Sequence, residues 1–232
     1  MTSRPHALST SGLCLLVAGA LAAMLFAPAS PAAADCPATS LRYPSTSQST
    51  TESTFDFTSP DGASSRGDHR AGVYSLFHPG GLAPTVITAR DRFDVTGVPP
   101  GTPVDVMLWI HIDGYAYTDG CSGTGCCGQL AATLRAFPDT ATVTFIGHTF
   151  QGRADFTGDV VLPISLVAGT PRDLEAEMYA RRCSGGAHTV TATGHVSFVG
   201  LPTGAVIVSC KGWGTATPAL RRSWGELKTI YR

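Results

Sequence analysis

Residues 104–112 have the sequence Val-Asp-Val-Met-Leu-Trp-Ile-His-Ile, and this stretch decides the fold class. Aliphatic residues occupy every second position, and Asp, Met, Trp and His stand between them. A period of two is the pattern of a β-strand, because successive side chains point to opposite faces of a sheet. The stretch therefore predicts a β-strand.

The same alternation recurs on both sides of this stretch. Further alternating runs lie at residues 143–145, 160–166, 174–180 and 190–198. Gly- and Pro-rich turn formers separate them, for example at residues 97–101, 169–171 and 202–204. About ten such strands, with no amphipathic stretch long enough for a crossover helix, predict an all-β fold. We expect an antiparallel β-sandwich; a closed barrel and two small sandwiches are the alternatives, although no linker divides residues 70–212.

The composition excludes several classes of protein. Of the 232 residues, 43% are hydrophobic and only 14% are charged, and the formal net charge is −1. Such a chain lacks the basic surface of a nucleic-acid-binding protein and the high net charge of a disordered one. The low charge is typical of a β-sandwich whose surface is rich in Thr and Ser.

The first 34 residues have the pattern of a secretory signal peptide. Arg4 supplies a positive charge, residues 12–27 are apolar, and small residues end at Ala34. A membrane anchor is the weaker alternative, because this apolar stretch is shorter than the roughly 20 residues that span a bilayer. We expect cleavage near Ala34 and a secreted or periplasmic mature chain without a transmembrane segment.

We expect three parts in the mature chain. Residues 35–65 form a Ser/Thr-rich arm that is flexible at its start, although residues 54–58 alternate as an edge strand would. Residues 66–212 form the sandwich, and residues 213–232 form a linker and a short helical or extended tail. The tail carries a recognition candidate made of Arg221, Arg222, Trp224, Lys228 and Arg232. The alternative is a terminal segment packed on the sandwich.

The mature chain has six cysteines: Cys36, Cys121, Cys126, Cys127, Cys183 and Cys210. An even number in an exported chain predicts up to three disulfides. We expect Cys121 to pair with Cys126 or Cys127, and the other of these two to reach a distant partner. Cys183 and Cys210 each follow a predicted strand and are expected to pair. A metal knuckle at residues 121–127 is disfavoured, because no second ligand pair has zinc-finger spacing.

Three segments carry a family resemblance. They are Asp-Arg-Phe-Asp-Val-Thr-Gly-Val-Pro-Pro-Gly-Thr-Pro-Val at 91–104, Val-Ala-Gly-Thr-Pro-Arg-Asp-Leu at 167–174, and residues 194–209. These turn and strand signatures resemble uncharacterised secreted bacterial β-sandwich proteins over residues 70–212. Arginine outnumbers lysine 14 to 2, which fits a GC-rich bacterial coding sequence. The resemblance implies a secreted β-sandwich and brings no catalytic residue with it.

The sequence contains no nucleophile elbow, metalloprotease helix or phosphate loop. Glu175 and Glu177 project from the same side of a strand, and a solvated strand face explains them better than catalysis. Plain turns explain residues 113–120 better than a calcium loop does. The cell-adhesion tripeptide at residues 66–68 is interpreted as accidental.

A metal hypothesis starts from four histidines, which are His111, His148, His188 and His195. No local segment supplies two of them as ligands, and the seven-residue spacing between the last two places them on opposite strand faces. We therefore expect no metal, no other cofactor and no catalytic residue.

Aromatic side chains give the binding hypothesis. Trp109, Tyr115 and Tyr117 lie on and just after the most apolar strand, and flat sugar rings stack on such side chains. The alternative places Trp109 in a strand that is buried on both faces. The sequence predicts an exported, non-enzymatic module with a binding or structural role at the cell envelope or outside the cell. Its expected partner is a glycan or another cell-surface component, and a carbohydrate-active or other hydrolytic enzyme on the same scaffold is the alternative.

Overall fold

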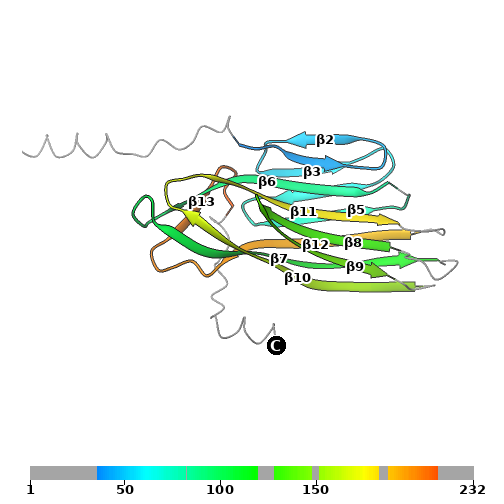
Figure 1. Ribbon diagram of the computed structural model, residues 1–232. Coiled ribbons are helices and arrows are strands. Elements are labelled where there is room, and N and C mark those ends of the chain that lie inside the picture. The colour runs from blue at the N-terminus through cyan, green and yellow to red at the C-terminus, as the bar shows by residue number, and fades with distance from the viewer. Residues whose placement is uncertain (1–35, 82, 120–127, 148–151, 183–187, 214–232) are drawn as a thin grey trace, which may run out of the picture. The chain divides into compact units, whose positions relative to one another are not determined.

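The computed structural model describes residues 36–81, 83–119, 128–147, 152–182 and 188–213 (Figure 1). Within these residues it contains strands only and no helix. The strands are β1 (Thr39–Arg42), β2 (Ser47–Thr50), β3 (Thr54–Thr58), β4 (Ser64–Asp68), β5 (Val73–His78), β6 (Thr85–Thr96), β7 (Pro103–Thr118), β8 (Gly128–Ala136), β9 (Asp139–Gly147), β10 (Gly152–Val167), β11 (Arg172–Arg182), β12 (His188–Val199) and β13 (Val206–Ser209).

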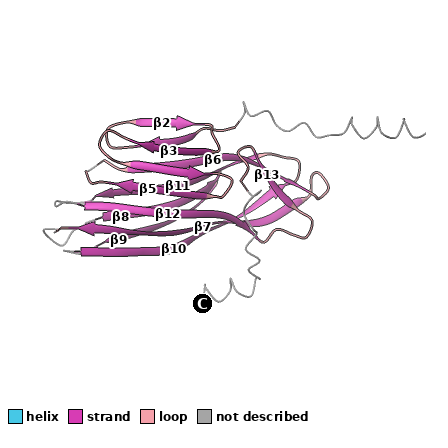
Figure 2. Ribbon diagram, turned by 180° about the vertical axis from the view of Figure 1, so that it is seen from behind, coloured by secondary structure: helices cyan, strands magenta, loops and turns pink. Residues whose placement is uncertain are grey.

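The strands form two antiparallel sheets that pack on one another, so the predicted β-sandwich is confirmed. Sheet A has the order β2-β1-β6-β11-β8-β9, and β13 also pairs with β6. Sheet B has the order β10-β7-β12-β5-β4-β3 (Figure 2). Strand β7 lies next to the edge strand β10, with which it pairs along its whole length, and it pairs with β12 along most of its length.

The alternation in residues 104–112 explains how β7 is placed. Its even-numbered side chains from Val104 to Ile112 are buried, and they face the side chains of sheet A. The two sheets meet closely where Phe93 of β6 packs against Phe198 of β12, with ring centroids 5.0 Å apart. They also meet at Gly194, where a Cβ atom would lie only 2.6 Å from the sulfur of Met178. The core therefore lies between the two inner faces, as in other sandwiches.

The start of the N-terminal arm, which we expected to be flexible, contains two strands. Residues 39–42 and 47–50 form β1 and β2, and β1 pairs with β6 in sheet A. Leu41 and Tyr43 are buried in the core, and their burial holds this segment on the sandwich. The edge strand expected at residues 54–58 is confirmed as β3, which lies at the edge of sheet B.

The predicted pairing of Cys183 with Cys210 is also wrong. Cys210 forms its disulfide with Cys36, and the two Cα atoms are 5.5 Å apart. The bond joins the chain just before β1 to the chain just after β13, and both of these strands pair with β6. The other cysteines, which are Cys121, Cys126, Cys127 and Cys183, lie outside the described residues.

The predicted signal peptide at residues 1–34 and the predicted tail at residues 214–232 also lie outside the described residues. Among the residues that are described, no helix could cross a membrane. Trp213, which we assigned to the linker, is buried and packs against Phe93 with ring centroids 5.0 Å apart. The sandwich therefore extends to this residue.

Candidate functional site

The three predicted aromatic residues share one surface, which is the outer face of sheet B. Trp109, Tyr115 and Tyr117 are odd-numbered residues of β7, whereas its buried residues from Val104 to Ile112 are even-numbered. Tyr117 is 47% exposed, and Trp109 and Tyr115 are half-buried. The strand is therefore buried on one face only, and the alternative that Trp109 lies in a doubly buried strand is excluded.

A hollow of about 400 Å³ surrounds Tyr115, and we call it the tyrosine hollow. It is lined by Asp113, Gly114, Tyr115, Arg153, Asp155, Phe156, Thr157, Thr191, Ala192 and Thr193. Strand register explains this set, because Tyr115 lies between Asp155 of β10 and Thr191 of β12. The strands approach closely here, since a Cβ atom on Gly114 would lie 2.4 Å from the carbonyl oxygen of Thr191.

One of the two faces of the Tyr115 ring is covered by a guanidinium group. The Cζ atom of Arg153 lies 4.1 Å from the centroid of the ring, which is cation–π distance. The Nε atom of Arg153 donates a hydrogen bond of 2.6 Å to Oδ1 of Asp155. Asp155 therefore fixes the position of the guanidinium group over the ring.

His111 stands between two carboxylates beside the tyrosine hollow. Its Nδ1 atom is 2.8 Å from Oδ1 of Asp159, and its Nε2 atom is 3.0 Å from Oδ2 of Asp113. The ring centroids of His111 and Trp109 are 5.9 Å apart. His111 thus connects the tyrosine hollow to Trp109 on the same face.

Strand register also places His195 of β12 directly opposite His111. Sequence spacing could not predict this pair, because it depends on a pairing between distant strands. The described residues nevertheless contain no group of three or more His, Cys, Asp or Glu side chains arranged to hold a metal ion. His148 lies outside the described residues, and so does the side chain of His188.

A second hollow, of about 450 Å³, lies on the outer face of sheet B over β4, and we call it the β4 hollow. It is lined by Thr54, Phe55, Asp56, Arg66, Gly67, Asp68, Val73 and Ser75. Arg66 donates two hydrogen bonds, of 3.0 and 2.5 Å, to Oδ2 of Asp56. Asp68 accepts hydrogen bonds from the backbone N–H groups of Arg70 and Ala71, at 2.9 and 3.2 Å. The tripeptide at residues 66–68 is therefore part of a strand, and both of its charged side chains have partners within the fold.

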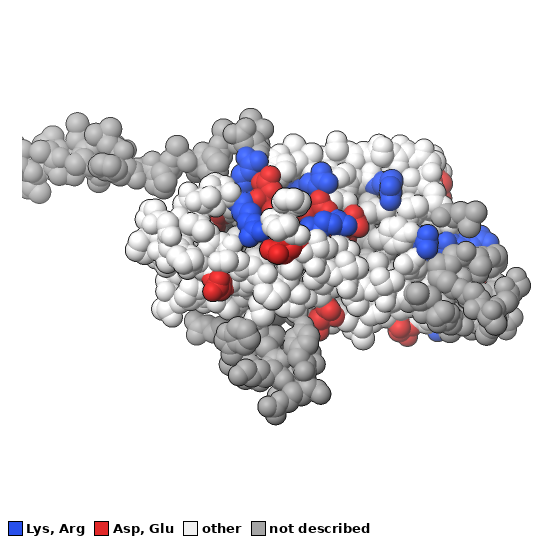
Figure 3. All heavy atoms as spheres, in the orientation of Figure 1, with Lys and Arg blue, Asp and Glu red and all other residues white. Residues whose placement is uncertain are grey.

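The carboxylates of Glu175 and Glu177 lie on the outer face of sheet A. Arg135 pairs with both of them, and Arg90 donates a hydrogen bond of 2.7 Å to Glu175. Arg92 pairs with Asp173 on the same face. Figure 3 shows basic and acidic side chains gathered together in this way on a surface that is otherwise mostly uncharged. The two glutamates therefore belong to a network of ion pairs on a strand face.

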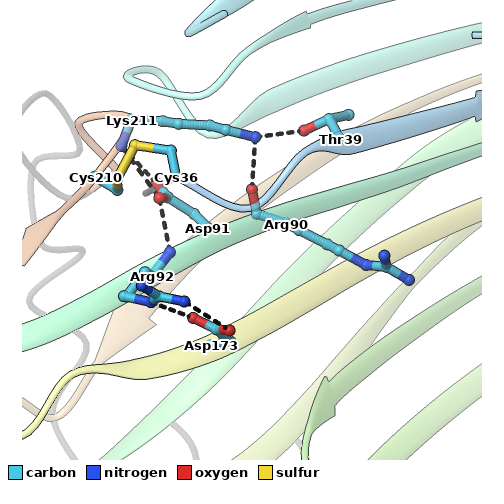
Figure 4. The surroundings of a disulfide bond; sticks show 8 residues. All are labelled: Cys36, Thr39, Arg90, Asp91, Arg92, Asp173, Cys210 and Lys211. Carbon is cyan, nitrogen blue, oxygen red and sulfur yellow. Dashed lines mark hydrogen bonds and ion pairs between the residues drawn. A yellow bond between two sulfur atoms is a disulfide. The ribbon is translucent and has the colours of Figure 1, made fainter. Parts of the chain in front are cut away.

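The sequence did not reveal a buried polar cluster next to the disulfide. Figure 4 shows Lys211, Thr39 and Asp91 of this cluster. The Nζ atom of Lys211 donates hydrogen bonds of 2.8 Å to Oγ1 of Thr39 and to the carbonyl oxygen of Arg90. The Oγ1 atom of Thr39 is 2.9 Å from Nε2 of His69, and Nδ1 of His69 is 2.9 Å from the hydroxyl of Tyr74. The cluster is closed to solvent, so its role is structural.

The charges in this cluster are affected by burial. Burial lowers the pKa of His69 to about 3 and that of Lys211 to about 8. Burial also raises the pKa of Asp91, whose carboxylate accepts hydrogen bonds from the backbone N–H groups of Arg92 and Lys211. Lys211 is one of only two lysines in the sequence. Its position next to Cys210 was the only sequence feature that could have indicated that this side chain is buried.

The five predicted tail residues, which are Arg221, Arg222, Trp224, Lys228 and Arg232, lie outside the described residues. The structure therefore brings together the aromatic candidates, on one face of one sheet, and does not place the tail.

Comparisons with known proteins give little further information. No family model matches the chain, and no curated protein matches it in sequence. Among solved structures, the chain is similar to TmCBM61 in complex with β-1,4-galactotriose, with 6% identity and a TM-score of 0.26 over 62% of this chain and 86% of that one. It is similar to a CBM4 structure with 11% identity and a TM-score of 0.26 over 62% of this chain and 96% of that one.

Proposed function

We propose that this protein is an exported, non-enzymatic module that binds a glycan on the outer face of sheet B. The observation that carries the proposal is the placement of Trp109, Tyr115 and Tyr117 on that one face, next to a hollow lined by hydroxyl and carboxylate groups. Sugar rings offer an apolar face of C–H groups and a rim of hydroxyl groups. Aromatic side chains bind the face, and Asp, Arg and Thr side chains bind the rim.

Two features support the export of the protein. Residues 1–34 have the pattern of a signal peptide, and we propose that the chain is secreted or periplasmic after cleavage near Ala34. The disulfide between Cys36 and Cys210 fits an oxidising compartment, since such bonds rarely persist in the cytosol.

The state of the carboxylates in the tyrosine hollow supports binding over hydrolysis. The side chains of Asp113 and Asp155 are 59% and 68% exposed, and each has a partner, His111 and Arg153 respectively. Hydrolysis by two carboxylates uses a general acid whose pKa is raised in a site that excludes water. Open, paired carboxylates are better suited to accept hydrogen bonds from sugar hydroxyls.

An array of soluble glycans tests this proposal with three forms of the full chain: the native sequence, the double variant Tyr115→Ala/Tyr117→Ala, and Tyr179→Ala. Tyr179 is a matched control, because it is a half-buried tyrosine on the outer face of sheet A. We expect the native chain and the control to bind the same neutral glycans. The double variant should bind at least about tenfold more weakly, since each lost aromatic contact is worth about 1 kcal/mol or more.

Two results would overturn the proposal. One is an array on which the native chain binds no glycan, and the other is equal binding by the native chain and the double variant. Release of shortened sugars from bound glycans would instead favour the hydrolytic enzyme.

A further inference from the structure

We infer that the glycan site crosses the strands of sheet B from the tyrosine hollow to the β4 hollow, and that its ligand is a neutral polysaccharide chain. This inference rests on the proposed function and specifies its ligand class. Four observations support it: the small side chains between the two hollows, the row of polar side chains that joins the hollows, the length of that row, and the charge of both hollows.

Two small side chains that carry hydroxyl groups lie between the two hollows. Thr193 lines the tyrosine hollow, and Ser75 lines the β4 hollow. These two residues are direct cross-strand partners, and their hydroxyl oxygens are 3.1 Å apart. Because both side chains are small, no bulky group at this position separates the hollows.

Strand register shows that this pair belongs to a row of polar side chains across the whole sheet, which we call the polar row. From β3 to β10, its members are Asp56, Arg66, Ser75, Thr193, Asp113 and Thr157. Every member is a direct cross-strand partner of the next and can form hydrogen bonds with a sugar hydroxyl. The row therefore offers a continuous polar track that runs perpendicular to β7.

The length of the polar row indicates a polymer. Six neighbouring strands at about 4.8 Å spacing give a track of about 24 Å. One sugar ring covers only a small part of this length, so several linked sugar units are needed to fill both hollows. Tyr115 lies next to the row at its β7 position, where it can stack on one unit of the chain.

The charges in the two hollows indicate a neutral ligand. The lining residues include four carboxylates, from Asp56, Asp68, Asp113 and Asp155, and two guanidinium groups. Both guanidinium groups already pair with carboxylates, Arg66 with Asp56 and Arg153 with Asp155. A uronate or sulfate group would meet a surplus of negative charge here, whereas neutral hydroxyl groups can donate hydrogen bonds to the carboxylates.

The test is a calorimetric titration of the full chain with β-1,4-linked gluco-, manno- and galacto-oligosaccharides of two to six sugar units. The variants are Asp56→Ala/Arg66→Ala in the β4 hollow and Arg92→Ala/Asp173→Ala. The second is a matched control, because it removes a cross-strand Arg–Asp pair from the outer face of sheet A.

For the native chain and the control, we expect the hexasaccharide to bind at least about tenfold more tightly than the disaccharide, because two connected subsites reinforce one another. The β4-hollow variant should lose most of this gain and keep the disaccharide affinity. A hexasaccharide oxidised at C6 to the uronate should bind at least about tenfold more weakly than its neutral form, because of charge repulsion.

Three results would overturn the inference: affinity that does not depend on chain length, a β4-hollow variant that binds the hexasaccharide as tightly as the native chain, or tighter binding of the oxidised form. Each of these would leave the proposed function standing if the disaccharide still binds and requires Tyr115. Absence of binding by every oligosaccharide would count against both.

Discussion

His69 is a buried histidine whose ionisation links pH to stability. Its ring is fully buried between Thr39 and Tyr74, and burial lowers its pKa to about 3. In the unfolded chain its pKa is about 6.5, so the unfolded state binds more protons between pH 6.5 and pH 3. The stabilisation is therefore complete above about pH 6.5 and is lost as the pH falls toward 3.

We expect the free energy of unfolding to decrease by up to about 1.4 kcal/mol for each pH unit in this range through His69 alone. Urea unfolding between pH 7.5 and pH 4.5 measures this slope. His69→Gln should reduce the slope, although His78, whose pKa is also lowered by burial, keeps part of it. His195→Gln is the control, because His195 is exposed. An unchanged slope in His69→Gln would contradict the account.

At the scale of residues, the sequence predicted the surface better than the buried polar groups. The alternation along residues 104–112 places Trp109 on the face of the strand that is opposite to the buried aliphatic side chains. Residue type alone suggests that Asp91 and Lys211 are exposed, since charged side chains are seldom fully buried. Their burial depends on hydrogen bonds between segments up to 172 residues apart, and a local pattern cannot show these.

The strands, too, could be predicted where the local sequence pattern is strong and not where their place depends on distant contacts. β7 was predictable, because its long alternation of large apolar residues is specific to a strand. β1 and β2 lie in a Ser/Thr-rich segment with few large side chains, so their sequence resembled a flexible arm. Their place in sheet A depends on Leu41 and Tyr43, which pack in the core between the two sheets, and a local sequence pattern cannot show this packing.

The disulfide between Cys36 and Cys210 fastens this N-terminal segment to the end of the sandwich. The two cysteines are 174 residues apart, and closure of so long a loop is expected to contribute about 2–5 kcal/mol to stability. We expect Cys36→Ser, Cys210→Ser and the double variant to unfold at the same lowered temperature, because each change breaks the same bond. Thermal unfolding followed by circular dichroism measures this. A double variant that loses about twice as much stability as either single variant would show that the two cysteines act separately.

Pairing of the cysteines could not be predicted, because it depends on the order of strands in the sheets. Cys36 and Cys210 meet because β1 and β13 both pair with β6, at opposite parts of that strand. Nothing in the spacing of either cysteine indicates this neighbourhood.

The molecule as a whole presents two different outer faces. That of sheet A carries a network of ion pairs around Glu175, in which the charges compensate one another. That of sheet B carries the aromatic side chains, the two hollows and the polar row. The sandwich was predictable from periodicity, whereas the hollows and the polar row required the register of all six strands of sheet B.

Hydroxyl-radical footprinting tests most directly the central claim that sheet B carries the binding face. The full chain is oxidised with and without a saturating neutral glycan, and the modification of each aromatic residue is measured by mass spectrometry. We predict protection of Trp109, Tyr115 and Tyr117, with no change at Tyr179 on sheet A or at the 91%-exposed Phe137. Protection of Tyr179 or Phe137, without protection on β7, would contradict the account.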